Sequence, residues 1–279
     1  MGSCTSREKW GEIEDLVKNS CRAIQFNKRD SDSIVKVFHR YSPHFHLSEQ
    51  QLKEALKEIE LPFNNECQKI YNLFLEHPKS CKFIERQNLA DEYTSNDPLY
   101  SVKKLSTFGI LLGEGKVQEK FHCLFFTYDI DASNNLSRWE IGVLLADVLE
   151  IVLEIIPEIG KIIHTDRSND IDEYKNTLAM MKKNFLEYFK FLILEDKLRE
   201  ITSEQFVEIM MQDDLKFMVE HSELRIFIKR NHEKCRLLSL ELAKDDTAQS
   251  EMRKAKNRRS RRTLMMPLEP VKVTETPGQ

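Results

Sequence analysis

Oxygen-bearing side chains alternate along residues 128–140, YDIDASNNLSRWE, and the run closes on a glutamate. Calcium takes six to eight oxygen ligands, and a twelve-residue loop supplies them from positions 1, 3, 5, 7, 9 and 12. Counted from the first aspartate, those positions hold Asp129, Asp131, Ser133, Asn135, Ser137 and Glu140. Asn135 would contribute its backbone carbonyl, and Ser137 would contribute directly or through water. The spacing therefore predicts a calcium site in which Glu140 binds with both oxygens.

One loop position departs from the usual pattern. Position 6 is ordinarily glycine, because the backbone turns there with a positive φ, and here it is Asn134. Asparagine tolerates this region better than most side chains, so we expect a modest penalty and a working site. Three carboxylates suit a sensor better than a tight buffer, which implies a dissociation constant of roughly 10⁻⁷–10⁻⁵ M. The competing interpretation is a polar surface loop that matches by chance.

Two helices must hold this loop in shape, and the apolar pattern predicts them over residues 117–128 and 139–156. Their inner faces carry apolar residues close to the loop: Phe125, Tyr128, Ile141, Leu144 and Leu145. Leu136, at loop position 8, supplies an apolar residue that would pair with a neighbouring loop. Helical flanks of this kind argue against the chance match.

The rest of the chain also follows helical spacing, so the predicted fold class is all-α, with no strand longer than a few residues. Further helices are expected over residues 7–26, 30–41, 48–60, 65–76, 85–92, 101–112, 171–194, 203–211 and 214–242. The apolar segment 140–163 is interrupted by four acids on one helical stripe: Asp147, Glu150, Glu154 and Glu158. A membrane span would not align four carboxylates. We expect an amphipathic helix there, broken near Pro157.

A short pattern recurs along the chain: an apolar residue, a hydroxyl, two variable residues, an acid or amide, and an apolar residue. Its copies are residues 136–141, 47–52, 201–206 and, more loosely, 84–89. Ordinary capping boxes explain the hydroxyl and the acid or amide, but not the long helices with aromatic residues before each loop. We therefore expect four related helix–loop–helix units. The loops at 42–51, 77–88 and about 194–205 lack the required carboxylates, so only the third unit is expected to bind calcium.

The run from residue 105 to residue 149 contains F-x-x-Y-D-x-D, the loop and a closing acid. It resembles the third EF-hand of neuronal calcium sensors, calcineurin B and plant calcineurin B-like proteins. The resemblance spans residues 31–215 and is strong around the third loop. It implies paired EF-hands in two lobes, no enzymatic activity, and regulation of a protein partner such as a kinase, a phosphatase, a channel or a cyclase.

The resemblance and the composition together predict five regions. Residues 1–30 form a lipidated arm and helix, and residues 31–95 form an N-terminal lobe with two degenerate EF-hands. Residues 100–215 form a C-terminal lobe with one intact and one degenerate EF-hand. Residues 216–250 form a C-terminal helix, and residues 251–279 form a disordered basic tail. The turn-forming stretch TSNDP, residues 94–98, separates the two lobes.

Both ends of the chain indicate a membrane. The start MGSCTS fits N-myristoylation at Gly2, and Cys4 is placed for palmitoylation, the second signal that stable anchoring needs. Residues 251–279 carry eight Lys and Arg against three Glu, a net charge of +5 within a chain of net charge −4. Such a tail suits an anionic leaflet, and phosphorylation of Ser260 or Thr263 would release it; a solvated tail or a nuclear localisation signal is the alternative. The expected location is the cytosolic face of a membrane.

Other chemistries find little support. The six cysteines form no C-x-x-C pair, which fits reduced cytosolic thiols, and His39, His44 and His46 lack a fourth ligand at zinc spacing. No nucleophile–base pair or phosphate loop indicates an enzyme, and the acidic body argues against nucleic acid as a partner. Two functions remain. The first is a lipid-anchored calcium sensor that regulates a protein partner; the second is a constitutive membrane-bound adaptor or regulatory subunit whose calcium is structural or absent.

Overall fold

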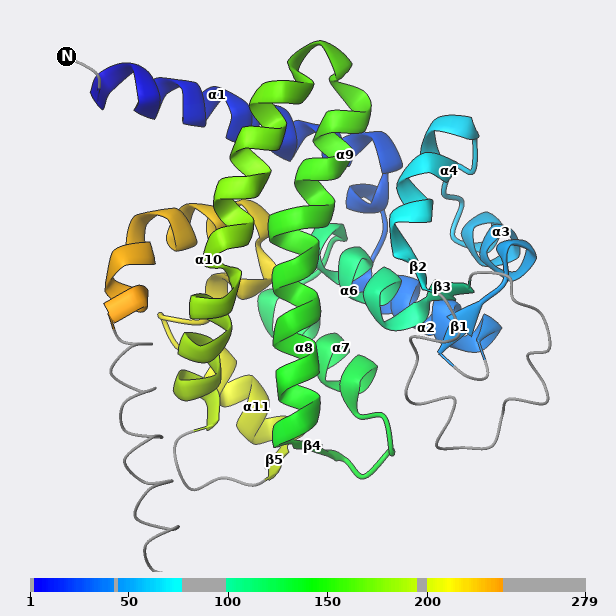
Figure 1. The fold of residues 1–279 in the computed structure, drawn as a ribbon. Helices are drawn as coiled ribbons and strands as arrows, with labels where there is room; N and C mark the ends of the chain where they lie inside the picture. Colours follow the sequence, from blue (N-terminus) through cyan, green and yellow to red (C-terminus); the bar gives the residue numbers. More distant parts are fainter. Residues whose placement is uncertain (1–2, 43–44, 77–98, 195–199, 238–279) are drawn as a thin grey trace, which may run out of the picture. The chain divides into compact units, whose positions relative to one another are not determined.

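The fold is mostly helical, with short strands between the helices (Figure 1). The computed structural model describes residues 3–42, 45–76, 99–194 and 200–237, with the backbone alone for residues 3–8. The helices are α1 (Ser3–Ser20), α2 (Ser31–Tyr41), α3 (Glu49–Glu58), α4 (Asn65–Tyr71), α6 (Val102–Leu112), α7 (Val117–Tyr128), α8 (Arg138–Glu150), α9 (Ile156–Ile163), α10 (Ser168–Leu194) and α11 (Ser203–Met210). A further helix, here called the C-terminal helix, covers residues 221–237. The predicted all-helical character is confirmed at this level.

The short strands form two small antiparallel sheets within the described residues. They are β1 (His46–Leu47), β2 (Leu75–Glu76), β3 (Leu99–Ser101), β4 (Asn135–Ser137) and β5 (Glu200–Thr202). β3 lies between β1 and β2, with Tyr100 opposite both Leu47 and Leu75. β4 pairs with β5, and Leu136 lies opposite Ile201. The apolar residue of the recurrent pattern is therefore a strand residue that pairs with another loop.

The hydroxyl of the recurrent pattern caps the helix that follows. The backbone N–H of Gln51 donates to Ser48 Oγ at 3.2 Å, and the backbone N–H of Ser48 donates to Gln51 Oε1 at 2.8 Å. The same reciprocal box begins α8 and α11. Each box satisfies two N–H groups that a helix start leaves unpaired. The fourth copy, at 84–89, and the helix expected over 85–92 lie outside the described residues.

The N-terminal sheet includes a segment that the sequence placed in the other lobe. β3 pairs with β1 and β2, and α6, which begins directly after β3, packs against α2. β3 carries no local signal of the recurrent pattern, because Ser101 is followed three residues later by Lys104 and forms no capping hydrogen bond. Lys104 instead forms ion pairs with Glu76 of β2 and Glu150 of α8. The described residues up to Cys235 belong to one compact unit.

Several predicted helix boundaries are wrong, and the helix expected to reach residue 26 ends at Ser20, before two 3-10 turns. The helix expected to reach residue 76 ends at Tyr71, and a 3-10 turn, Asn72–Phe74, leads into β2, whose residues pair with β3. The helix expected from residue 214 starts at residue 221, because Glu220 is extended after the 3-10 turn Lys216–Val219. That break turns Met218 and Val219 into the core, where both are buried.

The expected break near Pro157 is also wrong. α8 continues through a π-helical turn, Ile151–Ile155, into α9, and Pro157 lies at the start of α9. In a π-helical turn the carbonyl of Val152 would accept from the N–H of residue 157, which proline lacks. The guanidinium of Arg225 supplies a substitute, because its Nη1 donates to the Val152 carbonyl oxygen at 3.4 Å. The α8–π–α9 rod therefore runs unbroken from the loop at 129–140 to α1.

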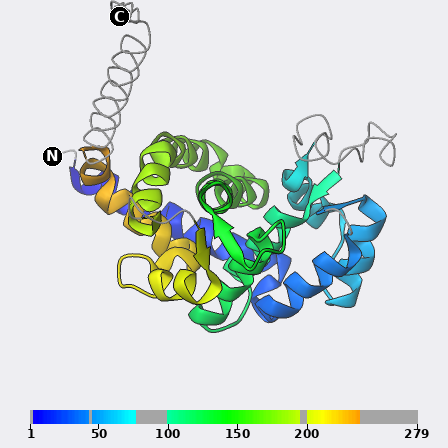
Figure 2. The same ribbon diagram turned by 90° about the horizontal axis from the view of Figure 1, so that it is seen from below.

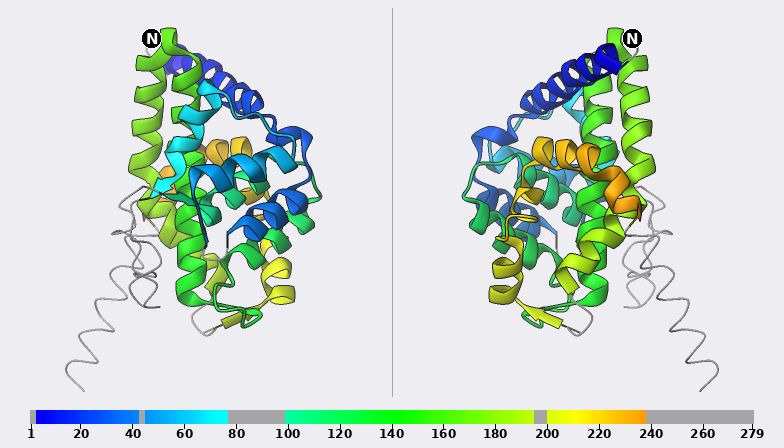
Figure 3. Two further views of the ribbon diagram at one scale, coloured as in Figure 1. Left: turned by 90° about the vertical axis from the view of Figure 1, so that its right-hand side faces the viewer. Right: turned by 90° about the vertical axis from the view of Figure 1, so that its left-hand side faces the viewer.

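The four acids of the predicted stripe face other helices within the fold. Glu150 pairs with Lys104 of α6 at 2.8 Å, and Glu154 pairs with Lys182 of α10 at 2.7 Å. Glu158 pairs with Lys175 of α10, and Asp147 accepts a hydrogen bond from α7. α10 lies alongside the rod over its length (Figure 3). In the part of the chain that the structure describes, no helix combines the length and the apolar character that a bilayer crossing requires.

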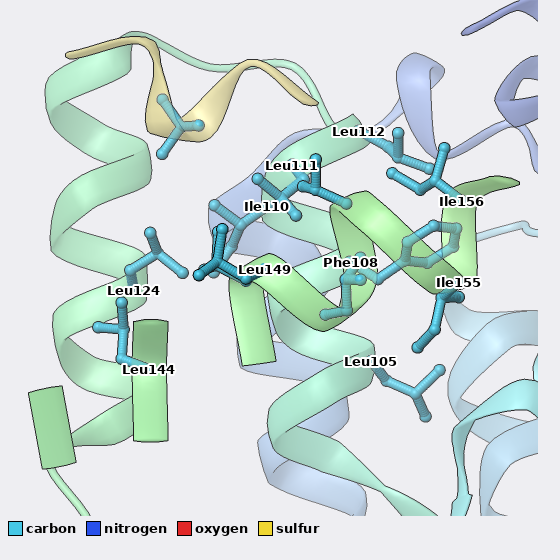
Figure 4. Close-up of a cluster of buried hydrophobic side chains, with 14 of the residues drawn as sticks. Leu105, Phe108, Ile110, Leu111, Leu112, Leu124, Leu144, Leu149, Ile155 and Ile156 are labelled. Atoms are coloured by element: carbon cyan, nitrogen blue, oxygen red, sulfur yellow. The ribbon is translucent and has the colours of Figure 1, made fainter. Parts of the chain in front are cut away.

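The core lies where α6, α7 and the α8–π–α9 rod meet. Leu105 and Phe108 of α6 and Leu124 of α7 point toward Leu144 and Ile155 of the rod, and all are buried (Figure 4). α2, α3 and α4 lie on one side of these elements, and α10 and α11 lie on the other (Figure 2). The loop at 129–140 is thus held by two helices that both belong to the core.

Candidate metal centre

Three carboxylates converge at the turn between α7 and α8. One oxygen each from Asp129, Asp131 and Glu140 lies within 4.8 Å of the others. Asp129 and Asp131 approach from the loop, and Glu140 approaches from the first turn of α8, where its side chain is 4% exposed. Among the described His, Cys, Asp and Glu side chains, this is the group placed to share one ion. Three of the six predicted ligands are therefore brought together.

The loop backbone already points its N–H groups at the first aspartate. The N–H of Ser133 donates to Asp129 Oδ1 at 2.9 Å, and the N–H of Asn134 donates to Asp129 Oδ2 at 3.0 Å. The Ser133 N–H also donates to Asp131 Oδ1 at 3.1 Å, and hydrogen bonds from Ser133 lower the pKa of Asp131. These bonds fold the loop around its carboxylates, so the oxygens are gathered at one place while still charged.

The other predicted ligands lie on the same loop. The Ser133 hydroxyl donates to the Asn135 carbonyl oxygen at 3.0 Å, which places the position-5 and position-7 oxygens side by side. Asn135 and Ser137 are the ends of β4. The Ser137 hydroxyl donates to Glu140 Oε2 at 2.7 Å and accepts from the Glu140 N–H at 3.3 Å. Ser137 is therefore both a loop oxygen and the cap of α8.

Both oxygens of Glu140 accept hydrogen bonds from the loop. Ile130 N–H donates to Oε1 at 3.1 Å, and Ser137 N–H donates to Oε2 at 2.8 Å. The carboxylate thus reaches across the turn and ties the second loop residue to the last. Glu140 therefore holds the loop at both of its ends through one side chain.

Two loop residues adopt the left-handed backbone conformation. Asn134 has φ 59°, and Ala132 has φ 53°. The first is the position where glycine is usual, and the asparagine side chain makes it tolerable, as the sequence predicted. The second was not predicted, because alanine carries no signal for a positive φ. The turn is therefore formed, at a conformational cost that glycine would avoid.

A hydrogen-bond chain links the helices on either side of the loop. Tyr128, the last residue of α7, donates from its hydroxyl to Asp147 Oδ2 of α8 at 2.9 Å. The Thr107 hydroxyl of α6 lies 2.9 Å from the same phenol oxygen. Burial raises the pKa of Asp147 to about 6, although Lys104 and the bond from Tyr128 act against this shift. The sequence identified Tyr128 as apolar helix packing and did not reveal its polar partner.

The strand paired with the loop belongs to the fourth unit. β5 ends in Thr202, which caps α11 through Gln205 at the position where the third unit has Glu140. Phe206 of α11 is buried and packs against Phe121 and Phe125 of α7. The fourth unit therefore supports the third through one strand and one aromatic cluster. Residues 195–199 of its loop, which the sequence predicts to bind no calcium, lie outside the described residues.

The predicted modification sites cannot be placed in the structure. Gly2, Ser260 and Thr263 lie outside the described residues, and Cys4 lies on the α1 backbone without a described side chain. Among the histidines considered for zinc, His44 is also outside, while His46 Nε2 lies 3.4 Å from Glu76 Oε2.

Comparisons with known proteins add no assignment. Neither the protein-family models nor the curated proteins nor the solved structures contain a match to this chain.

Proposed function

We propose that this chain is a calcium-binding sensor of the EF-hand type that regulates a protein partner. The observation that carries the proposal is the convergence of Asp129, Asp131 and Glu140 within 4.8 Å at a helix–loop–helix turn. Carboxylates at loop positions 1, 3 and 12, with a carbonyl at position 7, form an oxygen set that a hard cation such as calcium prefers. Calcium is the cofactor that this donor set fits.

The sheet between the third and fourth units supports a paired arrangement of EF-hands. β4 of the third loop pairs with β5 of the fourth. Loops that share a strand pair change shape together, so an ion in the third loop would also act on α11 through Ile201. We interpret the fourth unit as a structural partner that needs no ion of its own.

The α8–π–α9 rod can transmit a movement at the calcium loop to the N-terminal helix α1. Calcium would take both oxygens of Glu140 from Ile130 and Ser137, which moves the first turn of α8. α8 continues through the π-helical turn into α9, which packs against α1. A shift at the loop therefore reaches the N-terminal helix without a flexible joint. Repacking at α1 would change the surface offered to a kinase, phosphatase, channel or other effector.

A calcium titration read by tryptophan fluorescence tests the site. Trp139 lies at loop position 11 and is 60% exposed, so its emission should respond to ion binding at Glu140. We expect a saturable change at micromolar calcium in the unmodified chain and none in Glu140→Gln. Glu187→Gln, which removes an exposed carboxylate of α10, is the matched control and should titrate like the parent. Binding that survives Glu140→Gln would refute the assignment.

A capture experiment separates a sensor from a constitutive adaptor. A sensor changes its shape or its partner affinity between free and bound states, whereas a structural ion only adds stability. Partner capture at saturating calcium and in chelator should differ for a sensor. Equal capture in both, with saturable binding at Trp139, would instead favour the adaptor or regulatory subunit.

We also propose that the protein is held at the cytosolic face of a membrane by acylation of Gly2 and Cys4, with help from the basic tail. The support is the MGSCTS start and the net charge of +5 over residues 251–279, from eight Lys and Arg less three Glu. Gly2→Ala should move the protein from the membrane fraction to the soluble fraction. If Gly2→Ala fractionates like the parent, the lipid anchor is refuted, but the proposed calcium site is not affected by that result.

A further inference from the structure

The hydrogen bond between Tyr128 and Asp147 spans the two helices that carry the calcium ligands. Tyr128 immediately precedes Asp129, the first ligand, and Asp147 follows Glu140, the last ligand, by 147 − 140 = 7 residues. Seven residues are about two turns, so Asp147 lies on the same face of α8 as Glu140. The 2.9 Å bond from the Tyr128 hydroxyl to Asp147 Oδ2 therefore closes the helix–loop–helix on its inner side.

Among the described residues, no salt bridge includes the carboxylate of Asp147, although several charged groups lie near it. α6 contributes Lys103 and Lys104, α7 contributes Tyr128, and α8 contributes Glu150. Lys104 is itself held by Glu150 at 2.8 Å and by Glu76 of β2 at 3.3 Å. Lys182 of α10 pairs with Glu150 and Glu154. These ion pairs engage Lys104 and Lys182, so Asp147 shares the charge of Lys104 with two other carboxylates.

A carboxylate that is mostly withdrawn from solvent is unfavourable at this position. An amide or a hydroxyl oxygen could accept the same bond from Tyr128 without the penalty of desolvating a charge. Burial raises the pKa of Asp147 to about 6, so the carboxylate changes its charge close to neutral pH. Asp147 thus links the two helices that carry the ligands, and its negative charge is lost when the carboxylate is protonated.

We propose that Asp147 is a positioning residue for the calcium loop, and that protonation of its carboxylate weakens calcium binding at a site that it does not share. This inference rests on the proposed calcium site and adds a regulator to it. The ionised carboxylate makes a charge-assisted bond to Tyr128, which fixes the backbone at Asp129. It also adds a negative charge two helical turns along α8 from Glu140, which favours a cation in the loop. Protonation removes both contributions.

Calcium binding and ionisation of Asp147 are linked, so each favours the other. If ionised Asp147 favours calcium, bound calcium must favour ionised Asp147 by the same factor. On acidification the protein would then lose more calcium affinity than protonation of the loop ligands alone would cause. The ligand carboxylates are exposed or hydrogen-bonded at the loop, whereas Asp147 belongs to the interior between α6, α7 and α8. The two contributions can therefore be separated by changing Asp147 alone.

Calcium titrations at about pH 5.5 and about pH 7.5, read by Trp139 fluorescence, test the inference. Asp147→Asn keeps an oxygen that accepts from Tyr128 but cannot change its charge. We expect the parent to lose about fivefold more calcium affinity on acidification than Asp147→Asn does, at the lower end of typical coupling between sites. Asp213→Asn, an exposed aspartate whose side chain is 91% accessible, is the matched control and should follow the parent.

The outcomes distinguish this inference from the proposed function. If neither protein binds calcium at either pH, the calcium site itself is refuted. If both bind with the same pH profile, the site stands and the role of Asp147 is overturned. Tyr128→Phe gives a second test, because it removes the bridging hydroxyl and keeps the ring. Unchanged calcium affinity of Tyr128→Phe at about pH 7.5 would overturn the positioning role.

Discussion

Arg225 and Glu14 form a two-pronged ion pair in the interior of the protein. Arg225 Nη2 lies 2.6 Å from Glu14 Oε1, and Nε lies 3.0 Å from Oε2. The Arg225 side chain is 0% exposed, and the Tyr174 hydroxyl of α10 also donates to Glu14. With its remaining nitrogen, Arg225 reaches the Val152 carbonyl of the π-helical turn. One side chain therefore fastens the C-terminal helix to α1 and to the rod that leaves the calcium loop.

Removing either half of this pair should be strongly destabilising. Arg225→Met leaves Glu14, whose side chain is only 14% exposed, without its cation, and we expect a loss of about 3 kcal/mol in the free energy of unfolding. Denaturant titration followed by circular dichroism measures it. The double variant Glu14→Leu with Arg225→Met leaves no lone charge, so it should cost less than the sum of the two single changes. Additive costs would show that the two side chains do not act as a pair.

Calcium should stabilise the folded chain by mass action. An ion that binds only the folded state at a concentration of 100 times its dissociation constant adds about 2.7 kcal/mol. Denaturant midpoints with calcium and with chelator measure the gain. Glu140→Gln should lose the gain, while magnesium at the same concentration should give less, because it demands a smaller and more rigid site. An equal gain in Glu140→Gln would mean that the ion binds elsewhere.

The calcium loop was predictable from the sequence because all of its candidate ligands lie within one short segment. Asp129, Asp131 and Glu140 are close in space because they are close in sequence, so spacing alone places them together. The same holds for the capping boxes that begin α3, α8 and α11. Local hydrogen bonds of this kind need no knowledge of the tertiary fold.

The partners that are distant in sequence were not predictable. Arg225 and Glu14 are 211 residues apart, and no sequence pattern near either residue predicts their contact. Pro157 indicated a helix break, which a remote guanidinium prevents. β3 was missed because Ser101 forms no capping box, and nothing near Lys104 in the sequence indicates that it joins β2 to α8. In each case a tertiary contact overrides the local signal.

Glu76 should stabilise the fold at neutral pH and lose this effect in acid. Burial alone would raise the pKa of Glu76, but the contacts with His46 and Lys104 lower it to about 2. A lowered pKa contributes stability above the ordinary value near 4.5, and the contribution fades as pH falls toward 2. Glu76→Gln should therefore cost about 2–3 kcal/mol at neutral pH and progressively less below pH ~4. Urea titrations across this range measure it; Glu66→Gln, an exposed residue of α4, is the control.

Asp147 should show the opposite dependence. Its pKa is raised from 3.8 to about 6 by burial, so the protonated form stabilises the fold below the ordinary pKa, and that contribution is lost as pH rises through 6. Asp147→Asn cannot ionise and avoids the loss. Relative to the parent, it should gain about 2 kcal/mol of unfolding free energy between pH ~4 and pH ~7.5. Urea titrations in chelator measure this gain apart from any calcium effect. A stability difference that stays constant over the range would show that Asp147 does not titrate there.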